Sequence, residues 1–328
     1  MYYTVKGTNE YKVMVTFNFD LLDGFINRKT FFIIDSNVNV DIVSHKFNAF
    51  YSYSLNAKEE NKSLATYTEI ISLLTKYAFN KSDLIIAIGG GITLDLAGFI
   101  ASTFKRGIEL ILIPTTLLSI VDASIGSKNA LNYYEYKNVI GSFYDPSMVI
   151  INPSFLSTLD EDEFNNGLIE AIKMGLVKEP KILDALKNND INEVINLCVK
   201  AKCEVVNSDY FDKGYRHILN FGHTIAHAME LLNPNFRHGF SVGAGMLFFT
   251  LNQEKKKSLY DLLCNIYNVN EYIEFVMVNR YDVLDAINQD KKVRFDKVDC
   301  VLLDEDVQIK SLTLEEIDEI IRSFKING

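Results

Sequence analysis

The sequence has few of the features that mark secreted, membrane-spanning or nucleic-acid-binding chains. Its four cysteines, Cys198, Cys203, Cys264 and Cys300, form no CxxC pair, and the N-terminus shows no signal-peptide pattern. We therefore expect reduced, buried thiols and a cytoplasmic protein. No apolar run approaches the roughly 18 residues that a membrane span requires. The 33 basic residues against 43 acidic ones give a net charge of −10, which provides no general attraction to nucleic acid or anionic membranes.

Histidine is scarce as well, but it is unevenly distributed. Four of the five histidines fall between His217 and His238. Because imidazole is a common metal ligand, this cluster predicts a metal site or an acid–base centre. His223 and His227 are spaced to share one helical face. The spacing leaves open whether the pair 223/227, 223/238 or 227/238 binds the metal.

Residues beside these histidines suggest how the site is built. Gly222 precedes His223 and Gly239 follows His238, so the backbone can approach the site closely. Arg216 and Asn220 lie one turn apart on the predicted helix over 216–232. They add a planar cation suited to a carboxylate and an amide donor.

The first half of the chain alternates apolar runs with helix-like stretches. The runs cover 30–35, 84–90, 109–116 and 148–153, and the helical stretches include 63–79 and 95–104. Strands that are apolar throughout and separated by helices are typical of a parallel sheet covered on both faces. We therefore predict a Rossmann-like α/β domain over residues 1–155, with ligands at the carboxyl ends of its strands.

From about Glu161 a hydrophobic period near 3.6 residues dominates. It runs through the segments 162–177, 191–208, 216–232 and 242–256. A stretch of turn residues with a Ser/Thr/Asp helix start, at 152–160, marks the boundary. The pattern predicts a mainly α-helical domain over residues 156–328, whose last 30 or so residues carry little recognisable pattern.

A glycine-rich turn lies between an apolar run and a predicted helix. Gly89, Gly90 and Gly91 would let the backbone approach a phosphate at the positive end of that helix. Their spacing is not that of the GxGxxG fingerprint, and a structural tight turn is the alternative. Asp35 and Asn37, at the end of the first predicted strand, suit hydrogen bonds to ribose or adenine, but a strand-end turn explains them equally well.

A polar segment follows the predicted strand at 109–116. We expect Asp122, Lys128, Lys137 and Asn138 to lie there in a loop at the active edge of the sheet. Loop lysines are usually solvated. Lys128, however, has no acidic neighbour within four residues, and this suits contact with an anion.

One predicted helix carries a charged pair among apolar residues. Glu170 and Lys173 are three residues apart and hence on one helical face. They form either a plain ion pair or a metal ligand next to a substrate-anion contact.

Together these motifs resemble the 3-dehydroquinate synthase family, within the wider group of sugar-phosphate cyclases. The resemblance covers nearly the whole chain. It includes IIDSNV (33–38), GGGITLDLAGF (89–99), PTTLLSIVDASIGSK (114–128), GYRHILNFGHTIAHAME (214–230) and DKK (290–292).

The resemblance implies an activity of the shikimate pathway, which leads to the aromatic amino acids. It is the lyase reaction that converts 3-deoxy-D-arabino-heptulosonate 7-phosphate to 3-dehydroquinate and phosphate. NAD oxidises an alcohol transiently, phosphate leaves by β-elimination, and the hydride returns. Ring opening and an intramolecular aldol closure complete the carbocycle. A homodimer is also implied, in which Arg106 reaches the neighbouring subunit's site.

The resemblance also implies roles for single residues. Zinc, or cobalt, would be held by Glu170, His223 and His238. Arg216 and Lys202 would contact the substrate carboxylate, and Lys137, Asn138, Lys173 and one lysine of the DKK motif its phosphate. The full set of implied catalytic and substrate positions is Arg106, Asp122, Lys128, Lys137, Asn138, Lys173, Lys202, Asp212, Arg216, Asn220, His227, and Lys291 or Lys292. The implied NAD contacts are Asp35, Asn37, Glu59, Lys62, Gly89, Gly90, Gly91, Asp95, Thr115, Thr116, Asp122, Lys128, Lys137, Phe155, Thr158 and Leu159.

Four positions depart from the family pattern. Leu94 and Ser127 replace glycines, Asn129 replaces a threonine, and Asp212 replaces a glutamate. We expect Leu94 to crowd the cofactor pyrophosphate. We expect Asp212 to fall short by on the order of 1.5 Å, a misplacement that can slow an enzyme about a hundredfold.

Three other functions remain as alternatives. A sister cyclase would act on a sugar phosphate without a carboxylate, and Arg216 argues against it because that guanidinium would lack an anion. A metal- and NAD-dependent polyol dehydrogenase would not need so many lysines. A weakly catalytic paralogue would explain the departures at positions 94, 127 and 212.

Overall fold

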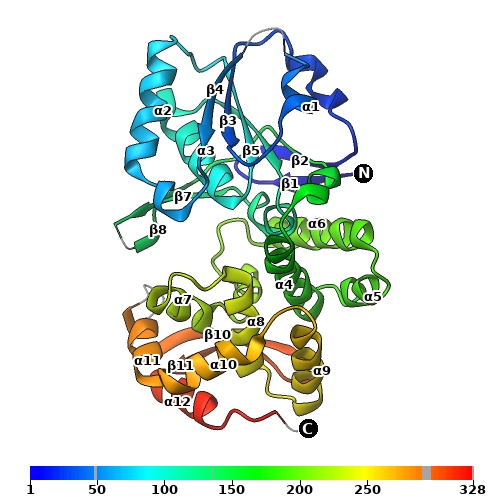
Figure 1. Ribbon diagram of the computed structural model, residues 1–328, viewed down its shortest axis with the longest axis vertical. Coiled ribbons are helices and arrows are strands. Elements are labelled where there is room, and N and C mark those ends of the chain that lie inside the picture. Colours follow the sequence, from blue (N-terminus) through cyan, green and yellow to red (C-terminus); the bar gives the residue numbers. More distant parts are fainter. Residues whose placement is uncertain (48–49, 135, 290–296, 327–328) are drawn as a thin grey trace. The chain divides into compact units, whose positions relative to one another are not determined.

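The computed structural model describes residues 1–47, 50–134, 136–289 and 297–326, so Lys291 and Lys292 lie outside the described residues. The chain divides into two compact units (Figure 1). The first comprises Met1–Phe164 and Ile191–Phe211, and the second comprises Asn165–Asp190 and Asp212–Gly328. In the part of the chain that the structure describes, no helix combines the length and apolar character that crossing a membrane requires.

The first unit is built on a seven-stranded sheet. Its order is β1 (Tyr2–Lys6), β2 (Glu10–Val15), β9 (Met148–Ile151), β6 (Glu109–Pro114), β5 (Leu84–Gly89), β3 (Thr30–Asp35) and β4 (Phe50–Leu55). β1 pairs antiparallel with β2, and the other neighbours pair in parallel. The strands predicted from apolar runs are confirmed as β3, β5, β6 and β9. The edge strands β1 and β4 carry many exposed residues and lack the apolar run by which the central strands were predicted.

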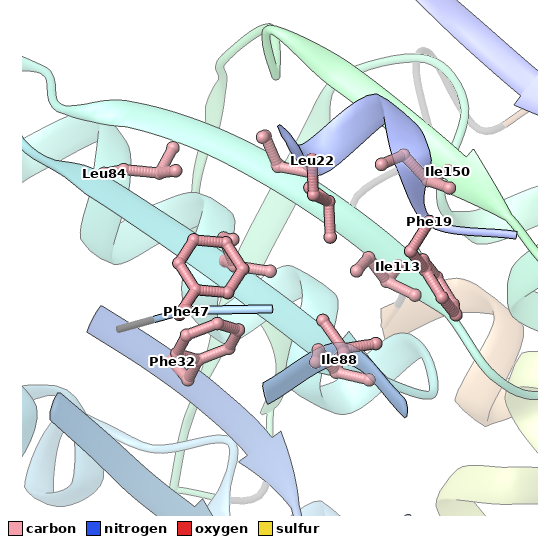
Figure 2. Packing of buried hydrophobic residues seen from close by; sticks show 11 residues of the cluster. Phe19, Leu22, Phe32, Phe47, Leu84, Ile88, Ile113 and Ile150 are labelled. Atoms are coloured by element: carbon pink, nitrogen blue, oxygen red, sulfur yellow. The ribbon is translucent and has the colours of Figure 1, made fainter. Parts of the chain in front are cut away.

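Helices cover both faces of this sheet, as predicted. In Figure 1, α2 (Leu64–Lys76) and α3 (Gly91–Thr103) lie on one side and α1 (Asp41–Ser44) on the other. Figure 2 shows Phe32, Ile88 and Ile113 of the strands packing with Phe19 and Leu22 of the η1 region (η1, Asp20–Phe25). Alternate strand residues point to the opposite face. The fold class is therefore a Rossmann-like parallel-sheet unit combined with a mainly helical second unit.

The strand order contains a point at which the chain reverses direction across the sheet. From β3 the chain moves outward to β4, whereas from β5 it moves the other way to β6. The connections that follow β3 and β5 therefore diverge, and the carboxyl ends of such strands are where ligands bind in open α/β sheets. Asp35 ends β3 and Gly89 ends β5.

The polar segment expected as a loop is regular structure instead. It forms a short π-helix, η4 (Ser119–Ala123), and an antiparallel hairpin of β7 (Lys128–Tyr133) and β8 (Tyr136–Phe143). The loop prediction was wrong because these strands are rich in Asn, Lys and Tyr and lack an apolar alternation. Helix α6 (Ile191–Ser208) packs on β1 and η4 and so belongs to the first unit.

The second unit is mainly helical, as predicted. Its elements are α4 (Glu161–Val177, whose first turn lies in the first unit), α5 (Lys181–Lys187), η6 (Tyr215–Asn220), α7 (His223–Leu232), α8 (His238–Phe249), α9 (Gln253–Cys264), α10 (Val269–Val278), α11 (Arg280–Gln289), the antiparallel strands β10 (Lys297–Leu303) and β11 (Val307–Thr313), and α12 (Leu314–Arg322). Two predicted helices are broken. The one over 216–232 breaks at Gly222, whose φ is +82°, and the one over 242–256 breaks between α8 and α9.

Glycines allow the backbone of α8 to lie against its neighbours. Every residue of α8 after His238 is buried. A Cβ placed on Gly239 would lie 2.0 Å from the carbonyl oxygen of Asn166 in α4. A Cβ on Gly245 would lie 2.1 Å from the carbonyl oxygen of Gly222, at the start of α7. The expectation that Gly222 and Gly239 permit close backbone approach is confirmed.

The expectation that all four cysteines are buried is confirmed for three of them. Cys198, Cys203 and Cys300 are buried thiols, but Cys264 is exposed at the end of α9. Burial raises the pKa of the Cys203 thiol to about 12, so this group stays protonated and unreactive at neutral pH.

We predict that Gly239→Ala destabilises the protein by about 1–3 kcal/mol or more, because the added methyl group overlaps backbone that cannot move aside. Urea unfolding measures the change. Gly24→Ala is the matched control, since a Cβ there meets nothing within 4 Å. Equal stability of the two variants would contradict the close packing of α4 and α8.

Candidate active site

Three helices of the second unit bring a carboxylate and two imidazoles together. Glu170 of α4, His223 at the start of α7 and His238 at the start of α8 each offer one ligand atom, and these atoms lie within 4.8 Å of one another. Glu170 Oε1 is 3.9 Å from His223 Nε2 and 3.8 Å from His238 Nε2. Of the three pairs that the spacing left open, the structure brings 223 and 238 together with Glu170.

The close packing of α4 and α8 positions this triad. Asn166 lies one turn before Glu170 on α4, and its Oδ1 accepts a hydrogen bond of 2.6 Å from the backbone N–H of Gly239. Gly239 directly follows His238. The bond therefore sets the start of α8, and with it His238, beside the carboxylate.

A second contact orients each imidazole. His238 Nδ1 lies 2.7 Å from Glu230 Oε1, and His223 Nδ1 lies 3.3 Å from the carbonyl oxygen of Phe221. When Nδ1 carries the proton that these acceptors require, Nε2 keeps its lone pair. Both Nε2 atoms then present a lone pair toward Glu170, which is the arrangement of metal-ligating histidines.

One oxygen of the carboxylate lacks a hydrogen-bond donor. Glu170 is 2% exposed, and among the described residues no group donates a hydrogen bond to its Oε1. Lys173 forms an ion pair with Oε2, but Oε1 faces the two imidazoles. A buried carboxylate is costly unless it is paired or coordinates a metal. Ligand atoms about 2.0–2.2 Å from a tetrahedral metal lie about 3.3–3.6 Å apart, so the observed spacing fits a divalent ion after a small contraction.

The pKa of His238 is raised above 6.5. Burial acts to lower it, but the hydrogen bond and charge of Glu230, together with the charge of Glu170, outweigh the burial. In the metal-free protein this imidazole thus holds its proton more tightly than an exposed histidine does.

The other predicted residues of the second unit lie around the triad or on a separate turn. The His227 ring is 5.5 Å from that of His223 and 6.4 Å from that of His238. Arg216 is buried on η6 and Asn220 ends it, so the expectation that they share the helix of His223 was wrong. The break at Gly222 separates them.

Asp212 has an unusual backbone. Its φ is +55°, in the left-handed region, which short polar side chains tolerate better than longer ones. His217 Nε2 lies 3.0 Å from its carbonyl oxygen. Aspartate suits this conformation better than the glutamate that the resemblance implies at this position.

In the first unit, predicted cofactor residues lie at the carboxyl ends of β3 and β5. Asp35 Oδ1 accepts the backbone N–H of Asn37 at 3.0 Å, which fixes the turn after β3. Gly90 precedes the first turn of α3 and has no side chain to cap it, so the helix N-terminus suits an anion. A Cβ on Gly89 would lie 2.6 Å from Thr93 Oγ1, so this glycine is also required by packing.

Further residues predicted to contact the cofactor follow β6 and β9, the neighbouring strands. The hydroxyl of Thr116 is 2.9 Å from that of Ser119, and Thr115 donates its backbone N–H to the carbonyl oxygen of Gly89. Phe155 packs on Phe19. The positions Thr158 and Leu159 lie at the end of η5 (Pro153–Thr158).

Lys62 joins residues predicted for cofactor and substrate. It is 5% exposed, and its Nζ lies 2.5 Å from Asp95 Oδ2 and 2.5 Å from Asn138 Oδ1. Burial raises the pKa of Asp95, and the charge of Lys62 opposes this shift. Glu59 lies on the short turn η2 (Glu59–Asn61) just before Lys62.

The remaining predicted cations lie at different depths. Lys202 of α6 is buried and forms an ion pair with Asp122 of η4. Lys128 and Lys137 are exposed on the hairpin. Arg106 is exposed, with a φ of +64° directly after Lys105 at +48°, so a strained turn presents its side chain.

The structure accommodates the other departures from the family. Leu94 is 2% exposed and lies in the interior of the first unit. Ser127 has a φ of +64°, which explains why glycine suits this position, and its hydroxyl donates to Asp145 Oδ1 at 2.5 Å. Asn129 Nδ2 donates to the carbonyl oxygen of Ser127 at 2.9 Å.

Sequence reasoning missed the residues that support the site. Glu230 orients His238, Asn166 fixes the start of α8, and Asn132 of β7 contacts Glu59 and Asn138. Glu230 and Asn166 lie on the faces of α7 and α4 that carry the ligands, and this spacing was the available signal. Nothing in the sequence marked Asn132.

The fold is that of sugar-phosphate cyclases. A crystal structure of 2-deoxy-scyllo-inosose synthase with carbaglucose-6-phosphate, NAD+ and Co2+ superposes with a TM-score of 0.83 at 23% identity, covering 99% of this chain and 100% of that one. The 2-epi-5-epi-valiolone synthase of Streptomyces hygroscopicus subsp. jinggangensis 5008, solved with NAD+ and Zn2+, gives 0.79 at 23% identity and covers 96% of each chain.

Sequence comparison identifies one family within this fold class. The N-terminal 3-dehydroquinate synthase family matches residues 52–166, and the C-terminal one matches residues 167–293. The 3-dehydroquinate synthase of Clostridium tetani (strain Massachusetts / E88) is 38% identical over 320 residues, which cover 88% of this chain and 85% of the relative. The chain belongs to the 3-dehydroquinate synthase family.

We predict that Glu230→Gln weakens zinc binding by about 10–100-fold, because outer residues that orient a ligand typically contribute this much. Competition with a chelator of known affinity measures the change. Asp261→Asn is the control, since Asp261 forms an exposed pair with Lys257. Unchanged affinity in Glu230→Gln would show that His238 needs no orienting carboxylate.

The raised pKa of His238 predicts how zinc affinity depends on pH. The protonated imidazole stabilises the metal-free fold fully below pH 6.5, and this contribution is lost as pH rises through the raised folded-state pKa. Zinc must displace the proton, so affinity should fall about tenfold per pH unit below that pKa. Titration calorimetry in two buffers of different ionisation enthalpy detects the released proton. An affinity that stays flat between about pH 5.5 and 8 would contradict the assignment.

Proposed function

We propose that this protein is a catalytically active 3-dehydroquinate synthase. It converts 3-deoxy-D-arabino-heptulosonate 7-phosphate to 3-dehydroquinate and phosphate. The observation that carries the proposal is the buried Glu170 carboxylate, whose Oε1 lacks a hydrogen-bond donor among the described residues and faces two oriented imidazoles. A weakly catalytic paralogue has no need to keep so costly an arrangement.

Glu170, His223 and His238 would hold a divalent metal, zinc or cobalt, which polarises the substrate hydroxyl when bound. NAD would bind at the carboxyl ends of β3 and β5 and accept and return the hydride. The glycine turn and Asp35 support this assignment, because an uncapped helix start suits the pyrophosphate and a carboxylate suits the ribose.

The cations supply the anion contacts that the substrate requires. Arg216 and Lys202, both buried, suit the carboxylate, because a planar guanidinium binds it through two hydrogen bonds. Lys137, Asn138 and Lys173 suit the phosphate. His227 beside the imidazole pair would contact the reacting hydroxyls. The predicted contact from Lys291 or Lys292 falls outside the described residues.

The proposal also covers the oligomeric state and the ligands that each part of the chain binds. Arg106 on its strained, exposed turn would reach the site of a second copy, so the working form is a homodimer. Residues 1–155 would supply most of the NAD contacts, and residues 156–328 the metal ligands and most of the substrate contacts. The buried reduced thiols suit the cytoplasm.

The test is to incubate the metal-loaded protein with catalytic NAD and the heptulosonate phosphate, and to follow phosphate release and carbocycle formation together. We expect both products in equal amounts with no net NADH, because the hydride returns in each turnover. Lys173→Ala and His223→Ala should lower kcat/KM by at least about a hundredfold, which is the loss expected when a reacting group is misplaced by about 1 Å.

Other outcomes would identify a different function. Accumulation of NADH would indicate a dehydrogenase. Turnover of a sugar phosphate without a carboxylate, but not of the heptulosonate phosphate, would indicate a sister cyclase. Bound NAD with no phosphate release from either substrate would indicate a paralogue without catalysis.

A further inference from the structure

The β7–β8 hairpin has a register break at the residues proposed to contact the substrate phosphate. Pairing is regular from Lys128 opposite Phe143 to Leu131 opposite Ile140, and resumes at Tyr133 opposite Tyr136. Between these points a single residue of β7, Asn132, faces the β8 segment 137–139. Such bulges take residues out of the ladder and redirect their side chains, often beside active sites. Lys137 and Asn138 lie in this bulge.

The side chain of Asn132 takes the place of the missing ladder bond. Its Oδ1 accepts the backbone N–H of Asn138 at 2.9 Å. Asn138 has a φ of +56°, a left-handed conformation that persists only when its surroundings hold it. This hydrogen bond fixes the bulge at the residue whose conformation is least favourable.

The other end of the same amide binds the segment that carries the proposed cofactor residues. Asn132 Nδ2 donates to Glu59 Oε1 at 2.7 Å and to the Glu59 carbonyl oxygen at 3.2 Å. The backbone N–H of Asn132 donates to the carbonyl oxygen of Lys62 at 2.8 Å. The side chain of Lys62 also reaches the bulge: its Nζ lies 2.5 Å from Asn138 Oδ1 and 2.5 Å from Asp95 Oδ2.

We propose that Asn132 is a positioning residue that sets the cofactor contacts and the phosphate contacts of the synthase from one amide group. Its carbonyl end holds the Lys137–Asn138 bulge, and its amino end holds Glu59 and the backbone of Lys62. The inference rests on the proposed function, because that function gives these four residues their roles.

The two ends of the amide can be separated by substitution. Asn132→Asp keeps an acceptor for the Asn138 N–H but places an oxygen where Nδ2 donated to Glu59, so two carboxylates meet. Asn132→Ala removes both ends. Tyr134→Ala is the control on the same hairpin, because this side chain is 80% exposed and has no proposed role.

The experiment measures kcat, the KM for the heptulosonate phosphate, the Kd for NAD and hydrogen exchange at the Asn138 amide, with melting temperatures for all variants. For Asn132→Ala we expect kcat/KM to fall about tenfold to a hundredfold, NAD to bind about tenfold more weakly, and the Asn138 amide to exchange faster. For Asn132→Asp we expect the amide protection and the substrate KM to stay within about threefold of wild type, while NAD binding weakens about tenfold. Tyr134→Ala should match the wild type.

Two results would overturn the inference. One is wild-type kinetics in a folded Asn132→Ala protein. The other is a uniform loss of substrate and NAD binding in Asn132→Asp, which would indicate general disruption of the hairpin. The Asn132→Asp measurement tests the positioning role even if the Asn132→Ala protein does not fold. A wild-type protein that releases no phosphate would instead reject the proposed function, and the Kd for NAD and the exchange at Asn138 would still test the positioning role.

Discussion

The structure of the second unit depends on one buried negative charge. Glu170 is almost fully enclosed, and no described group donates a hydrogen bond to its Oε1. A carboxylate in this state destabilises a fold unless positive charge is brought to it. The surrounding elements meet that requirement in two ways: α4 supplies the ammonium group of Lys173, and α7 and α8 begin at the two imidazoles with which Glu170 would share a metal ion. The placement of three helices is thus tied to the electrostatics of one side chain.

The two units hold their proposed ligand groups by different kinds of contact. In the second unit the ligand positions are set by main-chain contact, because the glycines at 222, 239 and 245 let the helices approach without intervening side chains. In the first unit the proposed ligand groups lie on turns and on a bulged hairpin, and side-chain hydrogen bonds hold them. Metal ligands need fixed geometry, whereas groups that bind an extended cofactor and a flexible phosphate can tolerate more movement.

The sequence predicted those strands and site residues that a local run of residue types or a short motif marks. The central strands were recognised because both faces are buried and their residues are apolar throughout, and the triad residues because of family motifs. The edge strand β4 was missed because its side chains are largely exposed. The break at Gly222 was missed because hydrophobic period does not reveal a single left-handed residue. Residue spacing left the histidine pair open, since the choice of 223 and 238 depends on how α7 and α8 pack. Asn132 was not predicted, because its role depends on a register break between two strands and no sequence pattern marks that break.

The ion pair between Lys173 and Glu170 has a consequence for the order in which ligands arrive. Without a metal, the ammonium group neutralises the carboxylate and is occupied in doing so. A divalent cation at the triad would take over this neutralisation, and the ammonium group would then be released for a phosphate. If Glu170 binds the metal and Lys173 the phosphate, as proposed, the event that completes the metal site would also create part of the anion site, and the metal would precede the phosphorylated substrate.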